Sequence, residues 1–166
     1  IKALSKRQGS TLFITLLATV KALLYRYTGQ EDIIVGSPTA GRDHQELEDQ
    51  IGFYVNTLVL RTQFSGKEDF LSLLHQVQTT TLDAQDHQSY PFDMLVDELD
   101  LERDMSRSPL FDVMVILQNI TEFSEDADTT ITEDSGTGMT ISKYDLNLSF
   151  VEKGDRIQIS INYNPD

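Results

Sequence analysis

The chain has 166 residues, which at about 150 residues per domain corresponds to one domain or to one lobe of a larger domain. With 13 Lys and Arg against 27 Asp and Glu, its net charge is −14 at pH 7, and this charge repels nucleic-acid phosphates and anionic lipid headgroups. We therefore expect neither nucleic acid nor a membrane surface as a partner. The absence of cysteine excludes disulfides, thiolate metal sites and thiol nucleophiles, and it favours a cytoplasmic location.

The first predicted element is a long helix. Ser10 or Thr11 can cap it, it runs to about Tyr27, and it closes at Gly29 in the left-handed conformation. Its apolar stretch is broken by two threonines and a lysine, and it is shorter than the ~18 apolar residues that a membrane span requires. The pattern therefore predicts a buried core helix.

Two strands are predicted next. Residues 33–35 form a short β-branched run, and the residues from Gly36 to Arg42 are expected to form a loop because Gly36 and Pro38 interrupt that run. Residues 53–61 carry apolar side chains at both odd and even positions. A strand with two apolar faces is typical of the interior of a sheet.

Two helices follow these strands. Ser65 and Glu68 have the spacing of a capping box for a helix that carries several apolar residues toward the core. Those residues are Phe70, Leu71, Leu74, Val77 and Leu82. Pro91 suits the first turn of a shorter helix that runs through Leu99.

The last third of the chain predicts a buried strand over 113–117 and a hairpin over 146–163 that turns at Gly154. Between them, residues 121–142 contain six acidic residues and no basic one, so we expect an exposed, mobile loop. Because strands and helices interleave before the closing hairpin, the fold class is predicted to be α/β, an α+β sandwich with a mixed sheet covered by helices.

Generic catalytic motifs are absent from the sequence. His44, His75 and His87 share no ligand spacing, and each is interpreted as a surface or packing residue. Asp97 and Glu98 are adjacent on a helix and point apart, so they cannot share a proton as an acid–base pair. We predict no catalytic residue and no metal site in this chain.

Several segments resemble the core motifs of condensation domains from nonribosomal peptide synthetases. Residues 51–61, IGFYVNTLVLR, resemble the fifth motif, GxFVNTxxxR, and residues 34–42 resemble the strand and loop upstream of it. Residues 87–93, HQSYPFD, resemble the sixth motif with Asp93 where Glu is common. Residues 103–110, RDMSRSPL, resemble the seventh with Ser108 where Asn is frequent. The resemblance covers essentially the whole chain.

The resemblance implies a fold similar to chloramphenicol acetyltransferase, in which two related lobes form a V around a tunnel. The family's catalytic HHxxxDG motif belongs to the N-terminal lobe and does not occur in this sequence. Residues 1–166 are therefore expected to be a C-terminal lobe cut from a longer polypeptide, with the N-terminal lobe missing. The implied reaction joins an acceptor amine to a donor thioester as an amide.

The implied partners are the N-terminal lobe, peptidyl and aminoacyl carrier proteins, and an adenylation domain. The 4′-phosphopantetheine arms belong to the carrier proteins, and no cofactor is expected to bind this chain directly. As half of a tunnel, the lobe is expected to be inert alone.

The resemblance also assigns candidate site residues. Asn56, Ser37 and Thr39 are expected to line the substrate tunnel, although a hydrogen bond at a strand end would explain Asn56 and turn chemistry would explain the other two. For Arg42 and Arg107, a salt bridge and a contact with the phosphopantetheine phosphate both remain open.

Four further residues are expected to be structural. Arg61 is interpreted as an ion-pair partner at the end of the sheet, and Tyr90 and Pro91 as an anchor for the start of a helix. Asp145, in a segment that resembles the family's KFDL stretch, is expected to support a loop.

Two other functions stay open at this point. One is a noncatalytic lobe that docks carrier or adenylation domains, and the other is a fragment of an epimerisation-type domain, whose motifs differ from the GFYVNTL and YPF segments found here. An apolar face exposed where the partner lobe belongs is also expected to favour a dimer.

Overall fold

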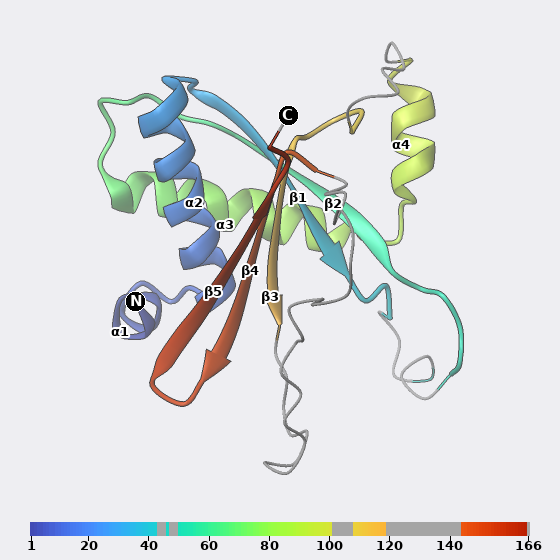
Figure 1. Ribbon diagram of the computed structural model, residues 1–166, viewed down its shortest axis with the longest axis horizontal. Helices are drawn as coiled ribbons and strands as arrows, with labels where there is room; N and C mark the ends of the chain where they lie inside the picture. Colours follow the sequence, from blue (N-terminus) through green and yellow to red (C-terminus); the bar gives the residue numbers. More distant parts are fainter. Residues whose placement is uncertain (43–45, 47–49, 101–107, 119–143, 166) are drawn as a thin grey trace.

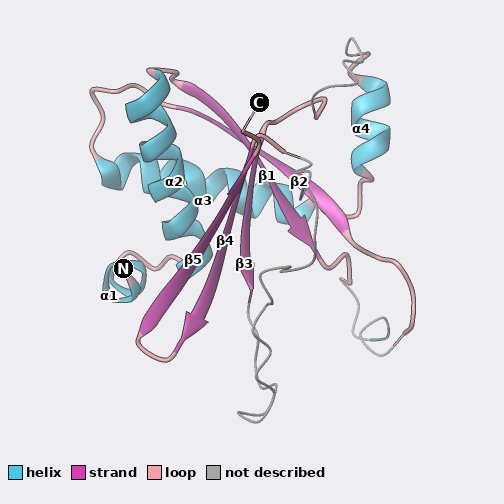
Figure 2. Cartoon of the chain, in the orientation of Figure 1, coloured by secondary structure: helices cyan, strands magenta, loops and turns pink. Residues whose placement is uncertain are grey.

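The computed structural model describes residues 1–42, 46, 50–100, 108–118 and 144–165. Within these residues, helices and strands interleave along the chain (Figures 1 and 2). The helices are α1 (Lys2–Arg7), α2 (Leu12–Thr28), α3 (Phe70–Asp86) and α4 (Phe92–Glu98). The strands are β1 (Asp32–Thr39), β2 (Asn56–Gln63), β3 (Val113–Gln118), β4 (Leu146–Lys153) and β5 (Arg156–Tyr163).

The strands form one mixed sheet in the order β2-β1-β3-β4-β5. The pairs β1–β2 and β4–β5 are antiparallel, whereas β1–β3 and β3–β4 are parallel. The mixed sheet with helices that the sequence predicts is thus confirmed.

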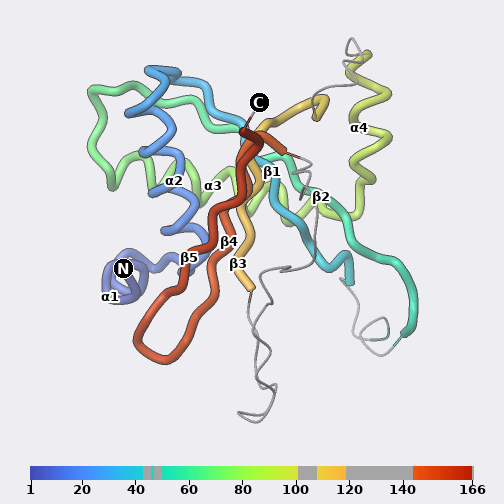
Figure 3. Tube along the Cα trace, in the orientation of Figure 1, coloured from blue at the N-terminus to red at the C-terminus, as the bar shows by residue number. Residues whose placement is uncertain are grey.

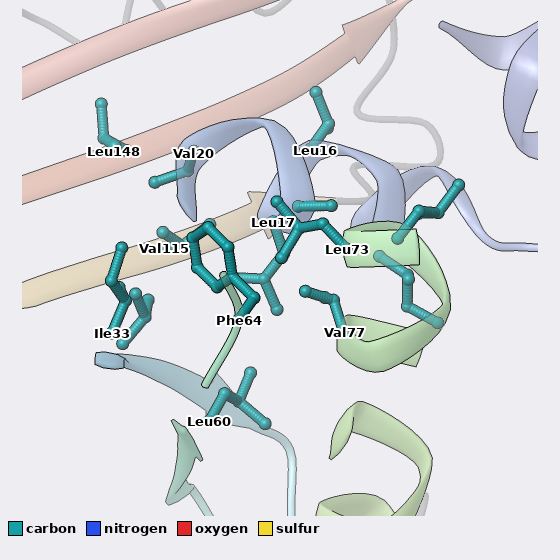
Figure 4. Packing of buried hydrophobic residues seen from close by; sticks show 14 of the residues in the cluster. Leu16, Leu17, Val20, Ile33, Leu60, Phe64, Leu73, Val77, Val115 and Leu148 are labelled. Carbon is teal, nitrogen blue, oxygen red and sulfur yellow. The ribbon is translucent and has the colours of Figure 1, made fainter. Parts of the chain in front are cut away.

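Helices α2 and α3 pack together and supply the core on one face of the sheet (Figure 4). Alternate strand residues point into this core, with Val35 opposite Leu60 and Val115 beside Leu148. These side chains are at most 4% exposed. By contrast, α4 carries no buried residue and lies beside β2, away from α2 and α3 (Figure 1).

The ends of α2 agree with the sequence prediction. The Thr11 side chain accepts a hydrogen bond from the backbone N–H of Ile14, which satisfies a donor that the first turn leaves open. Gly29 closes the helix at φ 70°, a left-handed conformation that glycine adopts without a steric penalty.

Two strand predictions need correction. β1 extends through Thr39, because it pairs with β2 along its whole length, and the expected loop therefore starts later. Pro38 is tolerated because the ladder between β1 and β3 is centred on Gly36, so that Pro38 lies beyond the part of β1 that has two neighbours.

The strand predicted for residues 53–61 begins at Asn56 and lies at the edge of the sheet, not in its interior. The apolar pattern on two faces misled the prediction because part of it precedes the strand. Phe53 and Val55 are 90% and 54% exposed and do not pack in the sheet.

Two details of α3 also differ from the prediction. Its N-cap is Asp69, whose side chain accepts from the backbone N–H of Ser72, while Ser65 and Glu68 form a turn just before the helix. Leu71 and Leu82 are exposed, and the core positions of this helix include Leu73, Leu74 and Val77. The predicted mobile loop over 121–142 lies outside the described residues.

Candidate functional site

Asn56 opens β2 opposite Thr39, the last residue of β1. Its side-chain nitrogen donates to the backbone carbonyls of Gln88 at 2.9 Å and Tyr90 at 2.7 Å. Its side-chain oxygen accepts from the backbone N–H of Thr57 at 2.9 Å and of Phe92 at 3.0 Å. An amide has two donors and two lone pairs, so all four hydrogen-bonding positions are occupied within the chain.

These bonds make Asn56 a clamp on the connection between α3 and α4. This connection lies outside any helix or strand, so few of its backbone groups are paired by secondary structure. Asn56 provides hydrogen-bond partners for two of its carbonyls and for the first N–H of α4. Asn56 also lines a pocket of about 330 Å³ together with Gly41, Tyr54, Gln88 and Pro91. Its contact with a substrate remains a prediction.

Gln88 links this pocket to β1. The Thr39 hydroxyl donates to the side-chain oxygen of Gln88 at 2.8 Å, while the backbone carbonyl of Gln88 accepts from Asn56. Gln88 is not identifiable as a site residue from the sequence, because its two partners precede it by 49 and 32 residues and no local pattern joins them.

Ser37 and Thr39 line a second, larger cleft of about 500 Å³ at the end of the sheet. The cap of α2 at Thr11, the β2 residue Leu58 and the α3 residue Gln85 complete its walls. The three predicted tunnel residues therefore line two different openings, with Ser37 and Thr39 in the larger cleft and Asn56 in the smaller pocket. The larger cleft is mixed in polarity and its charged lining residue is Glu152, which is ion-paired with Lys2 at 2.7 Å.

Arg42 lies at the rim of the smaller pocket. Its guanidinium stacks over the Tyr54 ring, 5.2 Å from the ring centre, and donates weakly to the carbonyl of Gly52 at 3.5 Å. The preceding Gly41 has φ 61°, and a side chain there would overlap the backbone carbonyl of Tyr54. A glycine is therefore needed for the chain to pass this close to Tyr54. Arg107 lies outside the described residues.

Arg61 forms a two-pronged ion pair with Asp32 across the edge of the sheet. Its Nη2 lies 2.7 Å from Asp32 Oδ2, and its Nε lies 3.0 Å from Oδ1. Hydrogen bonds from Arg61 and from Gln63 lower the pKa of the Asp32 carboxyl to about 2. This pair joins β1 to β2 at the end of the strands remote from Asn56.

Lys21 is a fully buried cation, although in the sequence it marks only an interruption of an apolar stretch. Its ammonium donates to the carbonyls of Leu60 at 2.7 Å and Ile33 at 3.2 Å, and to the Thr62 hydroxyl at 2.8 Å. Burial lowers the pKa of Lys21 to about 7, and the charge of Asp32 opposes this shift. The sequence alone predicts no role for Lys21; the signal that could have identified it is a lysine inside a predicted core helix.

Of the remaining predicted residues, Pro91 lines the smaller pocket, whereas Tyr90 and Asp145 line neither opening. Pro91 is the N-cap of α4, and the hydroxyl of Tyr90 donates to Glu98 at 2.8 Å, which raises the pKa of Tyr90. Asp145 is exposed, and its backbone carbonyl accepts from the N–H of Asn164 at 3.1 Å.

Two negative findings concern the described part of the chain. It contains no group of three or more histidine, aspartate or glutamate side chains placed to hold a metal ion. Across the same residues, no helix has both the length and the hydropathy needed to cross a lipid bilayer.

The sequence matches the model of the condensation domain over residues 1–166. It is 49% identical to one of the linear gramicidin synthase proteins of Brevibacillus parabrevis over 166 residues, which is 99% of this chain and 3% of that protein. It is 45% identical to bacitracin synthase 3 of Bacillus licheniformis and 41% identical to surfactin synthase subunit 1 of Bacillus subtilis, in each case over 99% of this chain. The chain spans 3% and 5% of the length of these two relatives.

Solved structures agree on the fold. The condensation domain of the monacolin K polyketide synthase superposes with a TM-score of 0.79 at 20% identity, covering 99% of this chain and 38% of that one. The first condensation domain of the CDA synthetase gives a TM-score of 0.72 at 20% identity, covering 97% of this chain and 35% of that one. Because the family model spans the whole sequence, this chain belongs to the condensation domain family and is part of such a domain from a nonribosomal peptide synthetase.

Proposed function

We propose that this chain is the C-terminal lobe of a condensation domain that forms amide bonds between carrier-bound substrates. In this role the lobe supplies one wall of a tunnel, and the N-terminal lobe supplies the other wall and the HHxxxDG histidine. The chain alone is then catalytically inert.

One observation carries the proposal. Beside the Asn56 pocket, three large apolar side chains point into solvent, with Ile51, Phe53 and Val55 exposed by 104%, 90% and 54%. A soluble protein rarely leaves such a group uncovered unless another protein surface covers it. The N-terminal lobe is the partner that would cover these side chains and close the openings into a tunnel.

The proposed chemistry is attack of the acceptor amine on the donor thioester. A C–N bond forms, the C–S bond breaks, and the amine proton leaves with the thiol of the donor arm. The demands on the protein are alignment of the two arms and exclusion of water. We assign alignment to the walls formed by Ser37, Thr39 and Asn56, with Asn56 acting through the α3–α4 connection that it holds.

The 4′-phosphopantetheine arms enter as parts of the substrates, carried by peptidyl and aminoacyl carrier domains that an adenylation domain loads. Arg42 stands at the rim of the smaller pocket, where a guanidinium would be suited to the phosphate of such an arm. We assign Arg107 to the same task. The reaction would take place in the cytoplasm, as the cysteine-free composition favours.

The test uses an excised condensation domain of the linear gramicidin synthase relative, in which this chain replaces the matching lobe. Donor- and acceptor-loaded carrier domains are added, and the amide product is measured by mass spectrometry. We expect product from the chimera and none from the 166-residue chain alone. Turnover by the chain alone would contradict its inertness. A folded chimera that binds both carriers without forming product would favour the noncatalytic docking role instead.

A further inference from the structure

Helix α1 and the turn between β4 and β5 meet at one end of the molecule, although they are 152 residues apart (Figure 3). The Lys2 ammonium donates to the carbonyl of Gly154 at 2.7 Å and forms the ion pair with Glu152. Also on α1, the buried hydroxyl of Ser5 donates to the hydroxyl of Thr15 of α2 at 2.8 Å. The short helix is therefore fixed both to the hairpin and to the core.

This end of the molecule carries five basic side chains and two exposed acidic ones, Glu152 and Asp155, so it is net positive in a strongly acidic chain. We define the basic surface as Lys2, Lys6, Arg7, Lys153 and Arg156, all of which are exposed. Apart from Lys2, none of these side chains forms an ion pair or side-chain hydrogen bond with another described residue.

Lys153 and Arg156 are direct cross-strand partners beside the turn. Two like charges at opposed positions of a hairpin repel each other and cost stability. On the opposite strand face, Glu152 is already neutralised by Lys2. An anionic group brought in from outside would relieve the repulsion, and the fixed backbone of α1 and the hairpin would keep the ordering cost low.

We infer that the basic surface docks an acidic protein surface, carried by a neighbouring domain of the same synthetase. The inference rests on the proposed function only for the source of that partner. A protein is favoured over nucleic acid or a membrane because extended polyanions would also meet the rest of a chain with net charge −14. A compact acidic surface would meet only this end.

The experiment titrates the ¹⁵N-labelled 166-residue chain with a poly-L-glutamate peptide and follows amide chemical shifts. The peptide is only about six residues long, so it spans about 20 Å and presents a compact acidic group instead of an extended polyanion. We expect shifts at Lys2 to Arg7 and at Lys153 to Arg156, which disappear when about 1 M salt shortens the screening length to about 3 Å. A DNA duplex and vesicles of phosphatidylcholine with phosphatidylserine are titrated in parallel. If either binds at least as tightly as poly-L-glutamate, or if no probe shifts these amides, the inference is overturned.

Charge-reversed pairs provide the matched controls. The double variant Lys6→Glu/Arg7→Glu should weaken poly-L-glutamate binding by roughly tenfold. The variant Arg26→Glu/Lys67→Glu changes the net charge equally at exposed positions elsewhere and should bind as the parent does. Equal weakening by both pairs would reduce the effect to net charge and contradict a defined surface. If the α1 variant does not fold, Lys153→Glu/Arg156→Glu makes the same comparison.

This binding assay is independent of amide formation. If no probe binds the basic surface, the activity of the chimera is not affected. If the chimera forms no amide, the binding measured in the titration is not affected either. The two failures are therefore distinguishable.

Discussion

Asn56 and Gln88 are joined by a 2.9 Å hydrogen bond from the side-chain amide of the first to the backbone carbonyl of the second. The same Gln88 accepts from Thr39 through its side chain, so one residue connects the ends of β1 and β2 with the entry to α4. Asn56 thus acts on the candidate site through the chain that it holds. Asn56 holds the backbone of Gln88, whereas Thr39 contacts its side chain, so substitutions at Asn56 and at Gln88 test the two interactions separately.

Replacing Asn56 by alanine should destabilise the chain more than replacing Gln88. Asn56→Ala removes four hydrogen bonds and leaves two carbonyls and two N–H groups to find new partners, with an expected loss of about 2–3 kcal/mol in the free energy of unfolding. Gln88→Ala removes only the side-chain bond to Thr39, because its carbonyl remains, and should cost about 1 kcal/mol. Urea unfolding of both variants measures the difference. Equal losses would contradict the clamp.

Lys21 makes the stability of the fold depend on pH. Its pKa is about 7 in the folded chain against 10.5 when it is unperturbed, so between these values the unfolded chain binds a proton that the folded chain lacks. The free energy of unfolding should therefore rise with pH from about 7 toward 10.5. Lys21→Met keeps the packing of the stem without the buried charge and should abolish this rise.

Urea unfolding at about pH 7 and about pH 9 checks the expectation, since Tyr90, whose pKa is raised above 10.0, does not titrate in this interval. At the lower pH the Met variant should be as stable as the parent or more stable, because a buried cation is costly to desolvate. A parent with the same stability at both pH values would contradict the role assigned to burial.

Asp32 introduces a second pH dependence of stability, which arises from hydrogen bonds to its carboxylate and not from burial. Its folded pKa of about 2 lies below its unperturbed 3.8, so the stability it contributes is present above pH 3.8 and is lost as the pH falls through about 2. Asp32→Asn should therefore reduce the loss of unfolding free energy that the parent shows between about pH 4 and about pH 2, as measured by urea unfolding.

The same variant should also change the pKa of Lys21. Because the charge of Asp32 raises that pKa, Asp32→Asn should lower it further, which NMR titration of the lysine side chain measures.

Much of the fold follows from patterns that are local in the sequence. Helix α2 is bounded by its own cap at Thr11 and its own glycine at Gly29, and the β4–β5 hairpin alternates around a glycine turn with φ 56° at Gly154. Such elements contain most of the interactions that fix their ends. Their prediction from sequence therefore succeeds.

Other features depend on contacts between distant segments. The edge position of β2 is set by which strands pair with β1, so the apolar pattern of one segment does not predict it. The same holds in the site, where Thr39 and Asn56 were recognisable from their motifs but Gln88 was not. Lys21 was visible as a cation in an apolar helix, yet its three acceptors lie on two strands that fold against it.

Gly36 and Phe111 provide the last prediction. The Phe111 ring is 4% exposed, stacks on Tyr144 with a centre-to-centre distance of 5.4 Å, and contacts the Phe92 ring at 5.8 Å. A methyl group on Gly36 would overlap the Phe111 ring, which has little room to move. Gly36→Ala should therefore lower the free energy of unfolding by about 1–3 kcal/mol, whereas Ser160→Ala on the exposed β5 should change it by less than about 0.5 kcal/mol.

The double variant Gly36→Ala/Phe111→Leu identifies the cause of that loss. Phe111→Leu alone removes ring contacts and is destabilising, but a smaller side chain also makes space for the methyl group of the first substitution. The double variant should then lose less stability than the two single losses added together, by at least about 0.5 kcal/mol. Strict additivity in urea unfolding would show that the cost at Gly36 arises in the backbone of β1 and not from the contact with Phe111.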